Sequence, residues 1–321
     1  MDFKHEPVMV TELISWLNCR PGGVYIDCTL GGGGHAQAIL ERISPGGHLI
    51  GIDRDPAALD AARRRLAPFK DMVSIIQGNY RDLKSLLAPF KLEKIDGFVF
   101  DLGVSSHQLE SPDRGFSYQQ DGPLDMRMNP QEGQTASDLV NGLSEDALAG
   151  IIQKYGEERW AKRIAQFIVQ ARRQKPLKTT GQLVEVIKAA IPAGARRRGP
   201  HPARRTFQAL RIAVNDELNS ISPSLKAAVE LLTPGGRLGA ISFHSLEDRI
   251  VKQTFRELAR GCTCPPKLPV CVCGKQPQLQ ILTRRPIGPT SGELERNPRA
   301  RSAKLRVGAK LAVVLKREVG E

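Results

Sequence analysis

A glycine-rich turn between an apolar run and a helix-compatible segment most restricts how this chain can fold. The run at 24–27 ends in an acid, four glycines follow at 31–34, and residues 35–43 suit a helix. Glycine permits positive φ and lets a ligand approach the main chain closely. The first N–H groups of a helix remain able to donate to a polar group. We therefore predict a buried strand, a loop that presents its backbone, and the start of a helix.

A second acid follows this turn at a spacing typical of nucleotide-binding proteins. Residues 48–53 form another buried-strand pattern that ends in Asp53, and an acid about twenty residues beyond the glycines typically bonds ribose hydroxyls. Gly31, Gly33 and Ala36 also match the glycine places of the dinucleotide-binding motif. A tight turn alone would explain the glycines. The position of Asp53 favours cofactor binding and leaves the identity of the cofactor open.

Strand and helix patterns go on alternating up to Asp101. Helix-compatible segments at 57–69 and 80–88 each lie next to a strand pattern, at 73–77 and 95–101. Alternation with short connections is typical of a parallel sheet covered by helices on both faces. We therefore predict an α/β fold with a doubly wound, Rossmann-like sheet.

The alternation then stops for about a hundred residues, more than an ordinary connection requires. Residues 112–133 have no clear period but carry aromatic and apolar side chains, which predicts an ordered loop. Apolar residues between 144 and 190 have helical spacing. We therefore predict an inserted, mainly helical domain.

Strand and helix patterns return in the C-terminal part of the chain. A helix pattern at 211–232, which we expect to break near Ser222–Pro223, leads to a strand pattern at 237–243, and two further strands are expected at 278–283 and 303–307. The predicted domain division is a first sheet part at 1–108, a helical insertion at 109–213 and a second sheet part at 214–321.

Positive charge is concentrated in the insertion. The formal net charge is +13, with 47 Lys and Arg against 34 Asp and Glu. Between Lys154 and Arg211 there are 15 basic and 3 acidic residues, so the rest of the chain nearly balances. A solvated helix face is the plain alternative, but the scarcity of acids among these cations favours a polyanion, and hence a nucleic acid, as the partner.

The composition is that of an ordinary globular protein, with 40% hydrophobic and 25% charged residues. No apolar run approaches the ~20 residues that a membrane span needs. The first residues show no signal-peptide pattern, which predicts a cytoplasmic protein.

Four of the six cysteines are clustered near the C-terminus, which is unlike a disulfide scaffold. A thiolate zinc site is one interpretation of the cluster, and unmetallated or redox-sensitive thiols are the other. The C-x-C spacing departs from the usual C-x-x-C knuckle. We therefore assign no metal role and keep four residues as zinc candidates: Cys262, Cys264, Cys271 and Cys273.

Several local sequences narrow the prediction. The order of strands, the glycine loop and Asp53 resemble class I S-adenosylmethionine methyltransferases. More specifically, the chain resembles the bacterial family that methylates the exocyclic N4 of a decoding-centre cytosine in small-subunit (16S) ribosomal RNA. The matching stretches run from the first strand to the last: 29–35, 101–106, 114–117, 121–128, 155–159, 206–212, 242–249 and 297–302.

The resemblance implies a set of cofactor contacts for S-adenosyl-L-methionine. Backbone amides of the glycine loop would lie beside its methionine end, Asp53 would bond its ribose, and Tyr80 would lie against its adenine. The full set implied is Gly33, Gly34, His35, Asp53, Tyr80, Asp101 and Gln108.

The resemblance also places the chemistry at the end of the fourth strand. A cytosine amine is a weak nucleophile because its lone pair is conjugated with the ring, so it needs proton acceptors and a positioned methyl donor. Asp101, helped by Ser105 and Ser106, would supply the acceptors. Methylation of a ring carbon would need a cysteine nucleophile, and none lies on this loop. His107 and His244 suit either a structural role or contact with the base.

The insertion would then bind the phosphates of 16S ribosomal RNA or of the small ribosomal subunit. Five arginines are its expected contacts: Arg196, Arg197, Arg198, Arg204 and Arg205. Three alternatives remain at this point. They are a nicotinamide dehydrogenase, a DNA cytosine or adenine amino-methyltransferase, and a non-catalytic RNA-binding assembly factor that retains the fold.

Overall fold

The computed structural model describes residues 7–197, 199–262, 264–265 and 272–312. The chain divides into two compact units. The sheet unit comprises Met1–Gly103 and Leu218–Glu321, and the helical unit comprises Val104–Glu217. Each unit is described here by itself.

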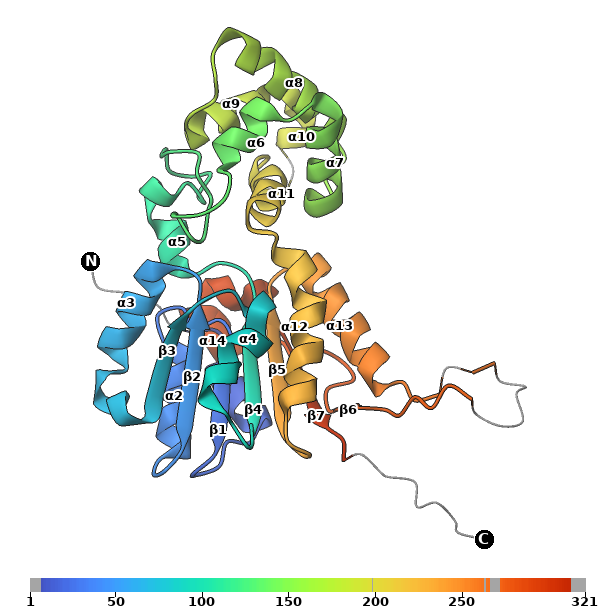
Figure 1. Ribbon diagram of the computed structural model, residues 1–321. Coiled ribbons are helices and arrows are strands. Elements are labelled where there is room, and N and C mark those ends of the chain that lie inside the picture. Colours follow the sequence, from blue (N-terminus) through green and yellow to red (C-terminus); the bar gives the residue numbers. More distant parts are fainter. Residues whose placement is uncertain (1–6, 198, 263, 266–271, 313–321) are drawn as a thin grey trace. The chain divides into compact units, whose positions relative to one another are not determined.

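The sheet unit is built on a sheet of seven strands in the part of the chain that the structure describes, in the order β3-β2-β1-β4-β5-β7-β6 (Figure 1). Strands β1 to β5 are parallel, and β7 runs antiparallel to both β5 and β6. The doubly wound α/β prediction is confirmed, with one antiparallel strand added. The strands are β1 Val24–Asp27, β2 His48–Asp53, β3 Val73–Gln77, β4 Gly97–Asp101, β5 Arg237–Ser242, β6 Leu279–Ile281 and β7 Lys304–Lys310.

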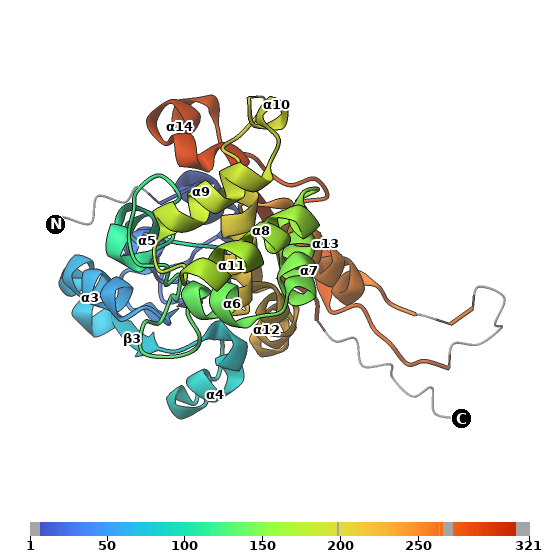
Figure 2. The ribbon, with the colours of Figure 1, turned by 90° about the horizontal axis from the view of Figure 1, so that it is seen from above.

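Helices cover both faces of this sheet (Figures 1 and 2). Successive strand residues alternate between two cores: Tyr25 and Val99 pack on one face, Ile26 and Phe98 on the other. This two-residue period is why the central strands β1 and β4 are almost entirely apolar and are buried on both sides. The first face is covered by α1 Val10–Leu17, α2 Gly34–Ile43, α3 Pro56–Arg65 and α14 Ser291–Arg296, and the second by α4 Leu83–Leu87, α12 Glu217–Leu231 and α13 Ser245–Ala259.

The helical unit has its own apolar core, to which its long loop also contributes. Phe116, Leu124 and Met126 are buried there, so the prediction of an ordered loop at 112–133 is confirmed. Its helices are α5 Ser106–Glu110, α6 Ala136–Gly142, α7 Glu145–Gly156, α8 Ala161–Gln174, α9 Thr180–Ala190, α10 Ala193–Arg196 and α11 Arg204–Asn215.

The predicted helix break near Ser222–Pro223 is wrong. The chain turns instead at Asp216, which has φ 49° and ends α11, and α12 continues through Pro223. Proline has no backbone N–H to donate within a helix. In the same turn, Ser224 Oγ donates a side-chain hydrogen bond to the carbonyl of Ser220 at 2.7 Å. The longest described helices have 15 residues, and no described helix has the length and apolar character of a membrane span.

Candidate active site

The glycine loop at the end of β1 has the backbone conformation that its sequence predicts. Gly31 has φ 51° and Gly33 has φ 79°, values that favour glycine. A Cβ atom on Gly34 would lie 2.7 Å from Cγ of Pro7, so this position also requires glycine for space. Gly33 is the N-cap of α2 and provides no side-chain acceptor for the helix. The loop is therefore a backbone surface that leads directly into a helix.

Asp53, at the end of β2, is fixed by the glycine loop. Its Oδ2 accepts from the N–H of Gly31 at 2.8 Å, and its Oδ1 accepts from the N–H of Asp55 at 2.9 Å. Burial raises the pKa of this carboxyl to about 6, although the two backbone bonds oppose that shift. A carboxylate offers about four acceptor positions, so capacity for ribose hydroxyls remains. Ribose binding stays a prediction, now with a defined geometry.

Asp101, at the end of β4, contacts the first turn of α2. Its Oδ2 lies 3.6 Å from Nδ1 of His35. Nε2 of the same imidazole lies 2.8 Å from the carbonyl of Val8. A carbonyl oxygen only accepts, so this ring nitrogen carries the hydrogen and donates. Burial lowers the pKa of His35, which favours the neutral ring and leaves a lone pair at Nδ1 facing Asp101.

The surroundings of Asp101 favour its protonated form. Burial, followed by the charge of Glu247, raises the pKa of Asp101 to about 8. The backbone N–H of Asp101 donates to Thr29 Oγ1 at 2.6 Å, which ties the strand to the glycine loop. Its Oδ1 is buried and has no hydrogen-bond partner among the described residues. A buried acceptor in that state costs free energy until a donor or a cation reaches it.

Asp27, at the end of β1, is a candidate site residue that the sequence reasoning missed. It is fully buried. Its Oδ1 accepts from the N–H of Thr29 at 3.1 Å, and its Oδ2 has no hydrogen-bond partner among the described residues. Burial raises the pKa of Asp27 to about 6. Its position in the sequence could have identified it, because Asp27 is the last residue of a buried strand, as Asp53 and Asp101 are.

Three carboxyls therefore end β1, β2 and β4, and the parallel strands bring these ends to one edge of the sheet. Two of the carboxyl oxygens are buried without a partner among the described residues. S-adenosylmethionine carries a sulfonium and an ammonium cation, and such groups suit buried carboxylates. The residues present therefore fit this cofactor.

Tyr80 lies just after β3 and is held by its neighbours. Its ring packs edge-on against Phe100, with centroids 5.8 Å apart and an interplanar angle of 83°. Its carbonyl oxygen lies 3.0 Å from Ser224 Oγ, whose single hydrogen it shares with the carbonyl of Ser220. The half-buried ring has a defined orientation, and contact with adenine remains a prediction.

Ser105 and Gln108 belong to the helical unit and form the N-terminal cap of α5. Ser105 Oγ accepts from the N–H of Gln108 at 3.2 Å, and Gln108 Oε1 accepts from the N–H of Ser105 at 3.0 Å. The side chain of Ser106 lies outside the described residues. His244 caps α13, and its Nε2 lies 3.0 Å from Glu247 Oε1, which supports the structural interpretation of that histidine.

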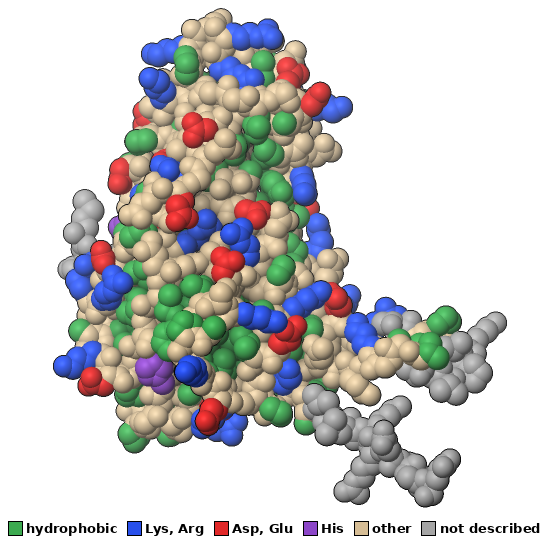
Figure 3. Space-filling view, in the orientation of Figure 1, with side chains coloured by type: hydrophobic (Ala, Val, Ile, Leu, Met, Phe, Trp, Pro, Cys, Tyr) green, Lys and Arg blue, Asp and Glu red, His purple; other side chains and the backbone are tan. Residues whose placement is uncertain are grey.

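The predicted RNA-contact arginines that the structure describes are exposed. Arg196 ends α10, Arg197 follows it, and Arg204 and Arg205 open α11. Arg205 Nη1 donates to the carbonyl of Glu157 at 3.0 Å. Arg198 lies outside the described residues. Lys and Arg side chains also stand at the end of the unit where α8 meets α9 (Figure 3), where the exposed residues include Arg173, Lys175 and Lys178.

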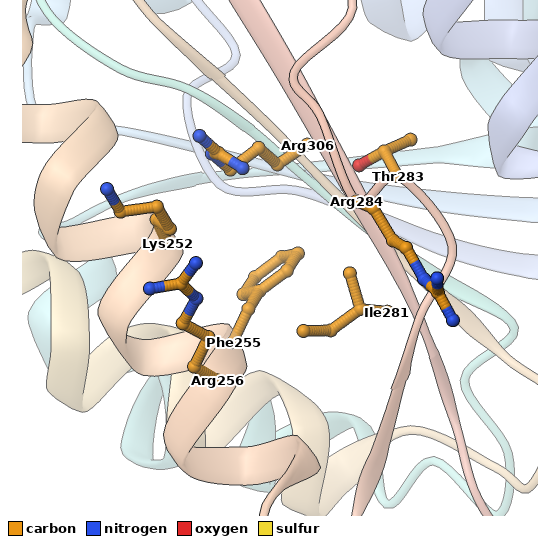
Figure 4. Close-up of a pocket in the computed structure, with 7 residues that line it drawn as sticks. All are labelled: Lys252, Phe255, Arg256, Ile281, Thr283, Arg284 and Arg306. Carbon is orange, nitrogen blue, oxygen red and sulfur yellow. The ribbon is translucent and has the colours of Figure 1, made fainter.

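A basic pocket of about 220 Å³ lies elsewhere in the sheet unit, between α13 and β6 (Figure 4). Phe255 and Ile281 form its apolar part, and Arg306, one of its cations, is paired with Asp248 at 2.7 Å. None of the predicted cofactor residues lines this pocket. The full lining is Lys252, Phe255, Arg256, Ile281, Thr283, Arg284 and Arg306.

Comparison with known proteins shows the family to which the chain belongs. The model of the MraW methylase family matches residues 2–311. Ribosomal RNA small subunit methyltransferase H of Symbiobacterium thermophilum is 58% identical over 311 residues, covering 97% of this chain and 98% of that protein. The proteins of the same description from Heliobacterium modesticaldum and Geobacter sulfurreducens are 56% and 58% identical, each over 97% of this chain and 100% of the relative. The predictions of family and of methyltransferase activity are confirmed. The chain belongs to the MraW methylase family.

Proposed function

We propose that this protein transfers a methyl group from S-adenosyl-L-methionine to the exocyclic N4 of a cytosine in the decoding region of 16S ribosomal RNA. Its relatives are described as ribosomal RNA small subunit methyltransferases. The observation that carries the chemistry is Asp101, a carboxyl at the end of β4 whose buried Oδ1 has no hydrogen-bond partner among the described residues.

The cofactor supplies an electrophilic methyl group on a sulfonium centre. Asp53 would hold the ribose, and the amides of the glycine loop would hold the polar methionine end. Asp27 and Asp101 would surround the cationic groups with negative charge. The low dielectric of the buried edge strengthens these interactions relative to water.

Asp101 would also act on the cytosine. In its ionised form it accepts a hydrogen bond from the exocyclic amine, which orients the nitrogen lone pair towards the methyl group. Thr29 and His35 would hold the strand end and the carboxyl in place. Cys28 is the cysteine next to the glycine loop, and burial raises the pKa of its thiol well above the ordinary value. This shift disfavours at Cys28 the thiolate nucleophile that methylation at a ring carbon would need.

The helical unit would bind the phosphates of the RNA, within the small ribosomal subunit and in the cytoplasm. Exposed arginines open α11, where they add to the positive end of the helix dipole. Positive charge placed there lowers the stability of the helix, and a bound anion reverses that effect. This arrangement favours a phosphate ligand over a merely solvated helix face.

The deciding experiment is methyl transfer from radiolabelled S-adenosylmethionine to small-subunit RNA, followed by mass mapping of the modified nucleoside. Label in N4-methylcytidine is expected. Label in 5-methylcytidine, transfer to DNA alone, or no transfer to naked RNA or to assembled subunits would each contradict the proposal. Retention of NAD in place of S-adenosylmethionine would favour the dehydrogenase alternative.

A further inference from the structure

A loop that joins α13 to β6 leaves the sheet unit and returns beside its starting point (Figure 1). At its base the N–H of Gln278 donates to the carbonyl of Leu258 at 2.8 Å. One step further out, a Cβ atom on Gly261 would lie 3.4 Å from Cδ of Pro277. The two legs of the loop are therefore close together where they leave the sheet unit.

This loop has no apolar core among its described residues. None of the described residues from 260 to 278 is buried, and Val272 is 80% exposed. Hydrophobic burial is the usual source of order in a folded segment, and long loops without secondary structure are usually functional or disordered. Apolar burial among the described residues therefore does not hold the two legs together.

Three cysteine sulfurs meet across the two legs. The Sγ atoms of Cys262, Cys264 and Cys273 all lie within 4.8 Å of one another. Those of Cys262 and Cys273 are 3.7 Å apart, whereas a disulfide bond measures ~2.05 Å. Two thiolates each ~2.3 Å from one zinc ion at a tetrahedral angle lie about 3.8 Å apart. The observed spacing corresponds to a hydrogen bond between two thiols, and it also fits two thiolate ligands of a single ion.

We propose that Cys262, Cys264 and Cys273 bind a structural zinc ion. Thiolates are soft ligands that select zinc over magnesium or calcium. The N–H of Cys264 lies 3.4 Å from Cys262 Sγ and donates to it, an interaction that stabilises a thiolate. The exposed cations Arg260 and Lys275 flank the cluster in sequence and offset its negative charge. Cys271 lies outside the described residues and is not part of this proposal.

The ion would fasten the outgoing leg of the loop to the returning leg. The same loop connects α13 and β6, which line the basic pocket. Zinc would thus stabilise the loop that links α13 to β6, two elements whose residues line that pocket. The site is separate from the carboxyl edge of the sheet and does not depend on the proposed methyl transfer.

Metal analysis of untagged protein, expressed with zinc in the medium, tests the site. About one zinc per chain is expected in the wild type, falling below ~0.2 in Cys262→Ser and in Cys273→Ser because a hydroxyl is a poor zinc ligand. Cys19→Ser is the matched control, since Cys19 lies outside the cluster on another segment, and it should keep its zinc. Wild-type protein with less than ~0.1 zinc, copper or iron in place of zinc, or zinc retained by both cluster variants would overturn the proposal.

Proteolysis tests the clamp independently of metal content. Chelation should speed trypsin cleavage after Lys275 roughly tenfold, because local opening exposes the backbone, while the melting temperature of the rest of the protein stays the same. Added zinc should restore protection in the wild type and in Cys19→Ser, and not in Cys273→Ser. Equal cleavage rates with and without zinc would show that no ion joins the legs.

Discussion

Nδ1 of His35 lies 3.6 Å from Oδ2 of Asp101, so the first turn of the helix after the glycine loop contacts the acid at the end of β4. The predicted cofactor loop and the predicted catalytic acid are thus joined by one side chain. Because Nε2 of His35 donates to the carbonyl of Val8, the imidazole cannot turn away without losing a buried hydrogen bond. The orientation of Asp101 is therefore coupled to the loop that would hold the cofactor.

Asp101→Asn should slow the methyl-transfer step by about 10²–10³, the loss typical when one preorganised transition-state contact is removed. The amide keeps the size of the carboxyl but presents a donor to the donor protons of the cytosine amine. Single-turnover methylation at saturating cofactor measures this step. Asp96→Asn is the control, because Asp96 accepts from the N–H of Val24 at the opposite end of the sheet. A near-normal rate for Asp101→Asn would limit Asp101 to cofactor binding.

Affinity for S-adenosylmethionine should rise between about pH 6 and pH 8. Burial raises the pKa of Asp27 to about 6 and, together with the charge of Glu247, raises that of Asp101 to about 8, so the site without ligand holds protons near neutral pH. A cationic ligand favours the ionised carboxyls and lowers their pKa, so binding releases protons and strengthens as pH increases. Calorimetry in buffers of different ionisation enthalpy measures this release. S-adenosylhomocysteine, which lacks the sulfonium charge, should release fewer protons; equal release would contradict the assignment.

The same pKa shift predicts how Asp101 affects stability. A carboxyl whose pKa is higher in the folded protein than in the unfolded chain stabilises the fold below the unfolded pKa, and this contribution is lost as pH rises through the folded pKa. The free energy of unfolding without ligand should therefore decline towards pH 8, and Asp101→Asn should flatten that decline. Urea denaturation between pH 5 and pH 8, with Asp96→Asn as control, provides the comparison.

Asp53→Ala should weaken S-adenosylmethionine binding ten- to a hundredfold, about 1.5–3 kcal/mol for a lost charge-assisted hydrogen bond. It should also lower the free energy of unfolding, because the N–H groups of Gly31 and Asp55 lose their acceptor. Asp55→Ala separates the two effects. Asp55 caps α3 through the N–H of Ala57, so its loss costs about 1 kcal/mol of stability with cofactor affinity retained. Equal affinities in the two variants would remove Asp53 from the cofactor site.

The double variant Arg196→Ala with Arg197→Ala should weaken RNA binding and reduce the slope of affinity against salt concentration. With fewer phosphate contacts, binding releases fewer counterions from the RNA. Arg63→Ala with Arg64→Ala removes the same charge from exposed positions of α3 and is the matched control. Filter binding at several salt concentrations distinguishes a local contact from a general effect of net charge. If both double variants lose affinity equally, the insertion has no special role.

Asn215→Ala should destabilise the helical unit by about 2–4 kcal/mol, because buried backbone groups lose their partners. Asn215 donates to the carbonyl of Met126 at 2.7 Å and accepts from the N–H of Met128 at 2.8 Å. The two tryptophans lie in different units, so Trp160 fluorescence in a Trp16→Phe background reports this unit alone. The exposed Gln170→Ala on α8 is the control and should unfold at the wild-type urea concentration.

The sheet was predictable because its signals are local. Apolar runs that end in acids located β1, β2 and β4, and the glycine turn identified the start of α2. The end of α11 had no such signal, because Asp216 adopts positive φ without being glycine. Pro223 was a misleading signal, since tertiary packing keeps α12 helical across it. The antiparallel direction of β7 depends on pairing with β5, which no local pattern specifies.

The candidate site was only partly predictable for a related reason. Sequence position identified Asp53 and Asp101, but the contact of His35 with Asp101 joins residues of different strand–helix units. Asp27 was overlooked because the neighbouring glycines offered a sufficient explanation of that turn. The convergence of Cys262 and Cys273 depends on the path of the loop between them, and their spacing in sequence departs from the common zinc motif.

The insertion between β4 and β5 has a consequence for folding during synthesis. These strands are neighbours in the sheet, yet the whole helical unit lies between them in the chain. The ribosome releases β1 to β4 and then the helical unit, which has its own core, before β5 exists. Bringing β5 to β4 closes a loop, and the entropy cost of closure increases with the length of disordered chain in that loop. Prior folding of the helical unit reduces this length, so β5 can pair with β4 at a lower entropy cost. Until then the edge of β4 remains an open template for pairing with other chains.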